Sequence, residues 1–154
     1  MSTQLQVRDV LNRFVEVHQQ RREVFRLLRT KVRTERFRVL LDGLIRQQER
    51  ILQGLQAQID GMSTDLLNTW FKQPLSPPAE EWNLEQIPFT DDEFETVFVP
   101  NLIQRYNENA MAFLSEARTR AQIPELTELF ASLMQVTEQE LLKQWEMTQA
   151  VREL

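Results

Sequence analysis

Residues 128–145 read "ELFASLMQVTEQELLKQW", a stretch whose apolar side chains recur three and four positions apart. This spacing places them along one face of an α-helix, which would bury that face against other helices. Thr137, Glu140 and Gln144 interrupt the face that Leu133 and its neighbours form. The stretch therefore predicts a packed helix with polar groups near its midpoint.

This helix is expected to cover residues 124–152, because Pro124 suits a first helical turn. The side chains expected to face inward are Leu126, Leu129, Phe130, Leu133, Val136, Leu141 and Trp145. The same periodicity predicts three more long helices, at 4–31, 35–60 and 91–120.

Local signals define the ends of these helices. Thr3 with Gln6 is a capping-box pattern, Thr34 is a suitable N-cap, and Gly61 is suited to a left-handed C-terminal cap. Pro100 is expected to kink or restart the third helix, because proline has no backbone N–H to donate.

Residues 61–90 form the long connection between the second and third helices and contain four of the six prolines. Ser63 or Thr64 can cap a short helix there. The aromatic side chains Trp70, Phe71, Trp82 and Phe89 favour a segment docked on the protein over a disordered linker.

The order of elements predicts an all-α protein with one domain, residues 1–154. Two antiparallel helical hairpins, 4–60 and 91–152, are joined by the crossover at 61–90, which lets the second and third helices run parallel. Only three glycines in 154 residues also disfavour a sheet with tight turns. We therefore expect a four-helix bundle.

Composition narrows the functional classes. The chain has no cysteine, which excludes disulfides, thiolate catalysis and cysteine-ligated metal. The net charge of −5 gives no general attraction to nucleic acid or anionic membrane. No signal-peptide pattern or membrane-length apolar run is visible, so a cytoplasmic protein is expected. Basic residues between 21 and 38 are interpreted as a solvated helical face, the alternative being an anion-binding patch.

Polar residues interrupt every apolar stripe near the middle of its helix. They are Arg21 with His18 beside it, Gln48, Asn107, and Thr137 with Glu140. Four interruptions at matching depth predict one internal layer, which we call the polar layer, with Arg21 paired to Glu140. The alternatives are that the helical phases are off by one position, or that Arg21 extends outward along its stem.

The segments "LLDGLIRQQERILQGL" (40–55) and "LFASLMQVTEQELLKQW" (129–145) resemble the second and fourth helices of the ferritin-like superfamily, especially rubrerythrin-like bundles. The segments "NENAMAFLSEA" (107–117) and "RREVFRLLRTK" (21–31) resemble the helices that supply one glutamate each. The resemblance implies a ferritin-like fold and, in an intact member, a pair of metals bound by these glutamates and by two Glu-x-x-His motifs.

This sequence departs from that ligand set. The two Glu-x-x-His positions hold Gln48 with Ile51 and Thr137 with Glu140, and the single-glutamate positions hold Arg21 and Asn107. The resemblance thus implies the fold without di-iron oxidase or iron-storage activity. We expect no cofactor and no metal.

No nucleophile–base pair or glycine-rich phosphate loop is readable, so an enzyme is not expected. We expect a non-catalytic bundle that acts through protein contacts, with an unidentified partner or with itself as a homodimer. Two alternatives stay open: a divergent metal or redox protein that uses the remaining glutamates, and a small-ligand pocket, most plausibly for an anion, beside Arg21.

Overall fold

The computed structural model describes residues 4–73, 75 and 93–152. Within these ranges the chain is helical and contains no β-strand beyond one isolated bridge between Gln6 and Trp70. The elements are α1 (Val7–Lys31), α2 (Glu35–Asp60), α3 (Thr64–Leu67), the π-helix η2 (Phe94–Phe98), α4 (Val99–Arg120) and α5 (Pro124–Arg152). The expectation of an all-α protein is confirmed.

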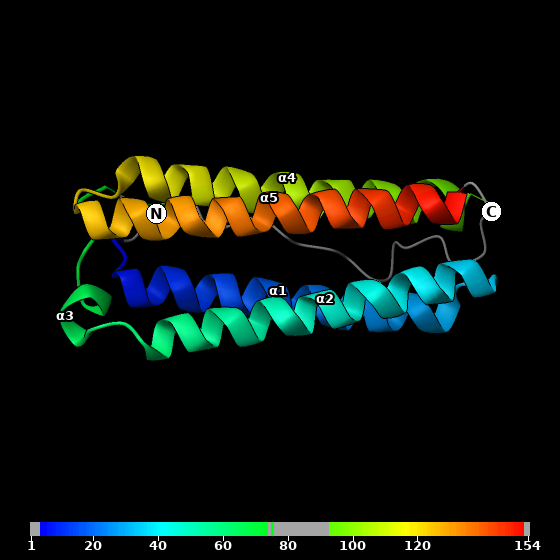
Figure 1. Ribbon diagram of the computed structural model, residues 1–154, viewed down its shortest axis with the longest axis horizontal. Coiled ribbons are helices and arrows are strands. Elements are labelled where there is room, and N and C mark those ends of the chain that lie inside the picture. Colours follow the sequence, from blue (N-terminus) through cyan, green and yellow to red (C-terminus); the bar gives the residue numbers. More distant parts are fainter. Residues whose placement is uncertain (1–3, 74, 76–92, 153–154) are drawn as a thin grey trace.

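The axes of the four long helices are nearly aligned, and the helices form two pairs whose members run in opposite directions (Figure 1). α1 packs along α2, α4 packs along α5, and α5 also contacts α2. α2 and α4 begin at the same end of the molecule and run in the same direction, as the colours of Figure 1 show. Two helices can run in the same direction only if the chain returns along the bundle between them, and the long connection from α2 to α4 allows this.

The helix ends follow local signals in most places. α2 and α5 have the predicted bounds, 35–60 and 124–152. α1 begins at Val7 because Gln6 forms the capping box with Asp9, whose Oδ2 accepts from the Gln6 N–H at 3.0 Å. Thr3, the predicted cap, lies outside the described residues.

The structure decides two predicted details of the helix ends, at Gly61 and at Pro100. Gly61 has φ −83° and ψ −7°, so the left-handed cap was wrong. The α2 terminus closes instead with right-handed geometry, and the Gly61 N–H donates to the Ala57 carbonyl at 3.1 Å. Pro100 lies in the first turn of α4, directly after η2. A first turn tolerates proline because its N–H would have no helical acceptor there.

The described part of the crossover is held to the start of α1. Ser63 caps α3, with its Oγ accepting from the Leu66 N–H at 3.2 Å. The Phe71 N–H donates to the Leu5 carbonyl at 2.9 Å, and the Phe71 ring is buried beside Phe130. Trp70 is 58% exposed and does not dock as expected. Trp82 and Phe89 lie outside the described residues.

The buried apolar side chains form two separate clusters. The first apolar cluster lies toward the N-terminal end of α1 and contains Val7, Val10, Leu11, Phe14, Leu55, Leu67, Phe71, Leu75, Ala110, Phe113, Leu114, Ala117, Leu126, Phe130 and Leu133. The second lies toward the other end and contains Phe25, Leu28, Val32, Phe37, Leu40, Leu41, Leu44, Phe94, Val99, Leu102, Ile103, Tyr106 and Val151. Between these clusters, buried polar residues lie near the middle of α1 and α2 and in the C-terminal third of α5.

A carboxylate from η2 secures the loop between α1 and α2. Glu95 accepts hydrogen bonds from the backbone N–H groups of Arg33 and Thr34, and from the Thr34 hydroxyl at 2.9 Å. Although burial opposes the shift, these hydrogen bonds hold the pKa of Glu95 below its ordinary value. Glu95 thus fixes the loop directly before α2, whereas the Thr34 side chain makes no cap hydrogen bond to the first turn of the helix.

Replacing Glu95 by alanine is expected to lower the free energy of unfolding by about 1–3 kcal/mol, because hydrogen bonds to a charged group are lost. Chemical denaturation measures this change. Glu138→Ala, on an exposed carboxylate of α5, is the matched control. Equal stability of the two variants would show that Glu95 does not secure the loop before α2.

No helix in the described part of the chain combines the length and the apolar content that crossing a membrane requires.

Candidate functional site

The six residues of the polar layer come together around one cavity of about 430 Å³ between α2 and α5. His18 and Arg21 line it from α1, Gln48 from α2, Asn107 from α4, and Thr137 and Glu140 from α5. His18, Arg21 and Gln48 are buried, whereas Asn107, Thr137 and Glu140 are half-buried. The sequence pattern therefore located residues that do share one site, although their depth in it differs.

His18 and Gln48 form the innermost contact of the polar layer. His18 Nδ1 lies 2.6 Å from Gln48 Oε1. An amide oxygen only accepts, so Nδ1 donates and a neutral ring carries its lone pair on Nε2. Nε2 is buried and has no hydrogen-bond partner among the described residues. The Phe14 ring packs edge-on against the imidazole, with centroids 4.7 Å apart.

His18 is held neutral by its surroundings. Burial first, and then the positive charge of Arg21, lower the pKa of His18 to about 3, against the opposing hydrogen bond with Gln48. The imidazole is therefore uncharged at physiological pH and cannot act as a general acid there.

Arg21 binds the backbone of α4. Its Nη2 donates to the Tyr106 carbonyl at 2.6 Å, and its guanidinium lies 4.9 Å from the centre of the Tyr106 ring. The residue is only 3% exposed, so it does not extend outward along its stem. A delocalised guanidinium over an aromatic ring is a favourable way to bury positive charge.

The predicted ion pair between Arg21 and Glu140 is wrong within the described part of the chain. Glu140 instead accepts from the Gln47 side chain, and its carboxylate lies 3.7 Å from Lys143 Nζ. The Gln47 amide also donates to the Glu140 carbonyl at 3.0 Å. The half-buried carboxylate reaches these nearer partners on α2 and α5, while Arg21 satisfies a backbone carbonyl across the bundle.

Sequence reasoning missed Gln47, which is fully buried and joins α2 to α5. Its oxygen accepts from the Gln144 side chain, and the Gln144 carbonyl accepts from Thr148 Oγ1 at 2.8 Å. A signal for Gln47 was present, because it follows Leu40 by seven positions and Leu44 by three. These residues extend the polar layer along the inner face of α5.

The C-terminal half of α5 is rotated relative to the prediction. Gln144, Thr148 and Val151 face inward, whereas Val136, Leu142 and Trp145 are 52%, 58% and 62% exposed. Val136 and Trp145 were predicted to face the core and do not. The buried amide contacts of Gln144 with Gln47 fix this orientation, so the apolar side chains take the outer face.

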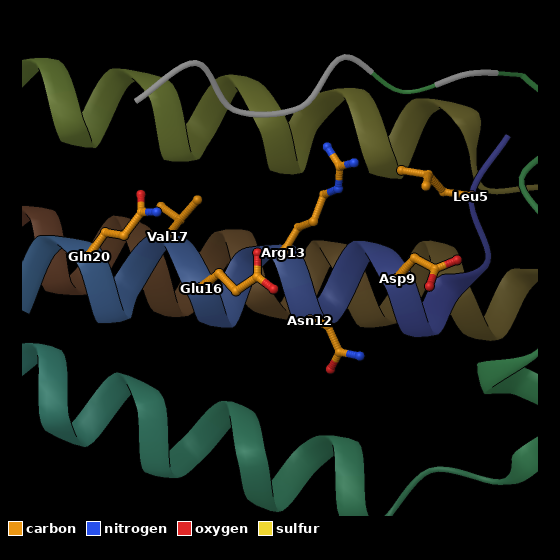
Figure 2. A pocket seen from close by; sticks show the side chains of 7 residues that line it. All are labelled: Leu5, Asp9, Asn12, Arg13, Glu16, Val17 and Gln20. Carbon is orange, nitrogen blue, oxygen red and sulfur yellow. The ribbon is translucent and has the colours of Figure 1, made fainter. Parts of the chain in front are cut away.

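A second hollow, of about 510 Å³, lies along the outer side of α1 and contains none of the predicted site residues (Figure 2). Its lining carries both charge signs, from Asp9, Arg13 and Glu16, together with amide and apolar groups. In Figure 2 the Arg13 side chain extends toward α4 and the Asn12 side chain extends toward α2. This mixture selects no single chemistry, so the central cavity is the candidate site.

Metal-ligating side chains do not gather at the cavity. Among the residues that the structure describes, no group of three or more His, Asp or Glu side chains is placed to hold a metal ion. His18 and Glu140 are the polar-layer side chains of a type that commonly ligates metals. The amides, hydroxyl and guanidinium around them are groups suited to hydrogen bonding.

No protein-family model matches this chain, and neither curated proteins nor solved structures give a match.

Proposed function

We propose that this protein is a non-catalytic helical bundle of ferritin-like topology that acts through contacts with another protein molecule. The topology rests on the order hairpin, long crossover, hairpin, and on the shared direction of α2 and α4 (Figure 1). The site rests on side chains that form hydrogen-bonded contacts at positions where the resemblance would place metal ligands. The function rests on the outer face of α5.

The outer face of α5 exposes large apolar side chains that do not pack in the core. Leu142 and Trp145 border a groove of about 410 Å³ between α4 and α5, together with Pro100, Ile103 and Leu141. We call Leu142, Trp145 and this groove the interaction face. The groove also carries polar side chains, among them Asn101, Gln104 and Gln149, and such a mixture of apolar and polar groups is typical of a protein contact surface. Tryptophan is enriched among the side chains that contribute most to binding energy.

A second copy of the chain is the simplest partner. The interaction face carries a protruding tryptophan and a groove side by side, so two copies related by a two-fold axis can each insert Trp145 into the groove of the other. Such an arrangement is self-complementary, as closed homodimers require.

The wild-type protein is expected to be dimeric in size-exclusion chromatography with light scattering, and Trp145→Glu is expected to be monomeric. A charge in the centre of an apolar contact removes the burial of tryptophan and adds desolvation. Trp70→Glu is the matched control, because Trp70 has similar exposure but lies next to α3. A wild-type protein that stays monomeric at all concentrations, or a dimeric Trp145→Glu variant with native helicity, would contradict the homodimer.

A further inference from the structure

We propose that the central cavity binds a small amphipathic carboxylate, with its apolar body against the first apolar cluster and its carboxylate at the polar layer. This cavity shares Asn107 and Leu141 with the groove of the interaction face, its other lining residues differ, and binding to it does not depend on self-association. Its volume of about 430 Å³ lies within the range usual for small-molecule sites.

The two ends of the cavity differ in chemistry. Phe14, Leu55 and Leu133 line one end and belong to the first apolar cluster, and Ile51 packs against that cluster from α2. Arg21, Gln48 and Gln144 line the other end, at the middle of the bundle. A ligand that satisfies both ends must therefore have a hydrocarbon body and a polar head.

The charges at the polar end select an anionic head. Among the described residues that line the cavity, three are basic, Arg21, Arg50 and Lys143, and one is a carboxylate, Glu140. That carboxylate is already engaged by Gln47 and lies beside Lys143, so its charge is partly compensated. Guanidinium groups bind carboxylates with matched planar geometry. Glu140, together with the apolar lining, favours one compact negative charge over a dianion such as phosphate.

The mouth of the cavity lies beside Gly54 on α2. A Cβ atom at Gly54 would meet no atom within 4 Å, so space for an entering molecule lies next to this position. Arg50, Gly54 and Gln58 recur four positions apart and form one row along the mouth. Their counterparts on α5 are Val136, Glu140 and Lys143.

Isothermal titration calorimetry with octanoate, octan-1-ol and octylamine tests this site on the full chain. Octanoate is expected to bind with one-to-one stoichiometry, and about tenfold or more tightly than the alcohol or the amine. The three probes share a hydrocarbon body, so the difference reports the head group. Undetectable octanoate binding, or equal affinity for octan-1-ol, would overturn the proposal.

Substitutions at the rim locate the binding without disturbing the core. Gly54→Trp is expected to abolish octanoate binding by filling the mouth, whereas Gln53→Trp, on an exposed neighbour outside the cavity, should leave it unchanged. The double variant Arg50→Glu, Lys143→Glu should weaken octanoate at least about tenfold, and Arg46→Glu, which is exposed and outside the lining, should not. Binding that survives both rim variants would place the carboxylate elsewhere and refute the site.

Discussion

Replacing Gln47 by alanine is expected to lower the free energy of unfolding by about 3 kcal/mol or more. Gln47 is fully buried, and its amide contacts Glu140 and Gln144 on α5. The substitution leaves these groups without their partner, at about 1–3 kcal/mol for a buried polar group. It also opens a void where the side chain was, which adds to the loss. Denaturation in urea, monitored by helicity, measures the change.

Gln53→Ala is the matched control, because Gln53 is exposed on the same helix, and its effect should stay within about 0.5 kcal/mol. The double variant Gln47→Leu, Gln144→Leu is expected to cost less than the sum of the single changes to leucine, because it removes both members of one contact. A Gln47→Ala variant as stable as Gln53→Ala would show that this amide does not join α2 to α5.

Stability is expected to fall as the pH decreases below about 6.5, with a contribution from His18 of up to about 1.4 kcal/mol per pH unit. The pKa of His18 is lowered to about 3 in the folded protein by burial and by Arg21. His18 therefore binds a proton near pH 6.5 in the unfolded chain, but only near pH 3 in the folded protein. Between these values each decrease in pH favours the unfolded chain, and above them the contribution is constant.

His18→Gln separates this contribution from that of the carboxylates, which are present in both proteins. Unfolding free energies of wild type and variant are measured from pH 7.5 to pH 4.5. As the pH falls, the wild type should lose about 2–3 kcal/mol more unfolding free energy than the variant. The variant lacks the titrating ring but keeps an uncharged polar side chain. Parallel curves for the two proteins would show that His18 titrates normally in the folded state.

The boundaries of the helices were largely readable from the sequence because local chemistry decides them. Pro124 and the break near residue 32 mark ends that depend on one or two residues, whereas Thr34 precedes α2 without a side-chain cap hydrogen bond. Gly61 shows the limit of such signals, since a glycine permits a left-handed cap but does not require one. Here the α2 terminus closes in the right-handed region.

The orientation of α5 was readable only in part: Leu126, Phe130 and Leu133 are buried as predicted, but the C-terminal part of the helix carries two plausible inner faces. Hydrophobicity favours the side with Val136 and Trp145, whereas the structure buries the side with Gln144 and Thr148. The choice depends on a specific acceptor, the Gln47 side chain of another helix. Periodicity reports the average polarity of a face and carries no information about a matching amide elsewhere in the chain.

The members of the polar layer were predictable, but their partners were not. Each member interrupts an apolar stripe, which is a pattern within one helix. The Arg21 side chain binds a backbone carbonyl of α4, and every residue has such a carbonyl, so no residue type marks the acceptor. Pairing Arg21 with Glu140 by charge alone overlooked both this carbonyl and the nearer amide of Gln47.

The chain has a single histidine, so one nuclear magnetic resonance titration of its imidazole tests the buried polar layer most directly. In the folded protein the His18 ring signals should stay those of a neutral imidazole down to about pH 4.5, because the pKa is lowered to about 3. A titration midpoint near pH 6.5 in the folded state would place His18 in solvent and contradict its burial among polar side chains between the two apolar clusters.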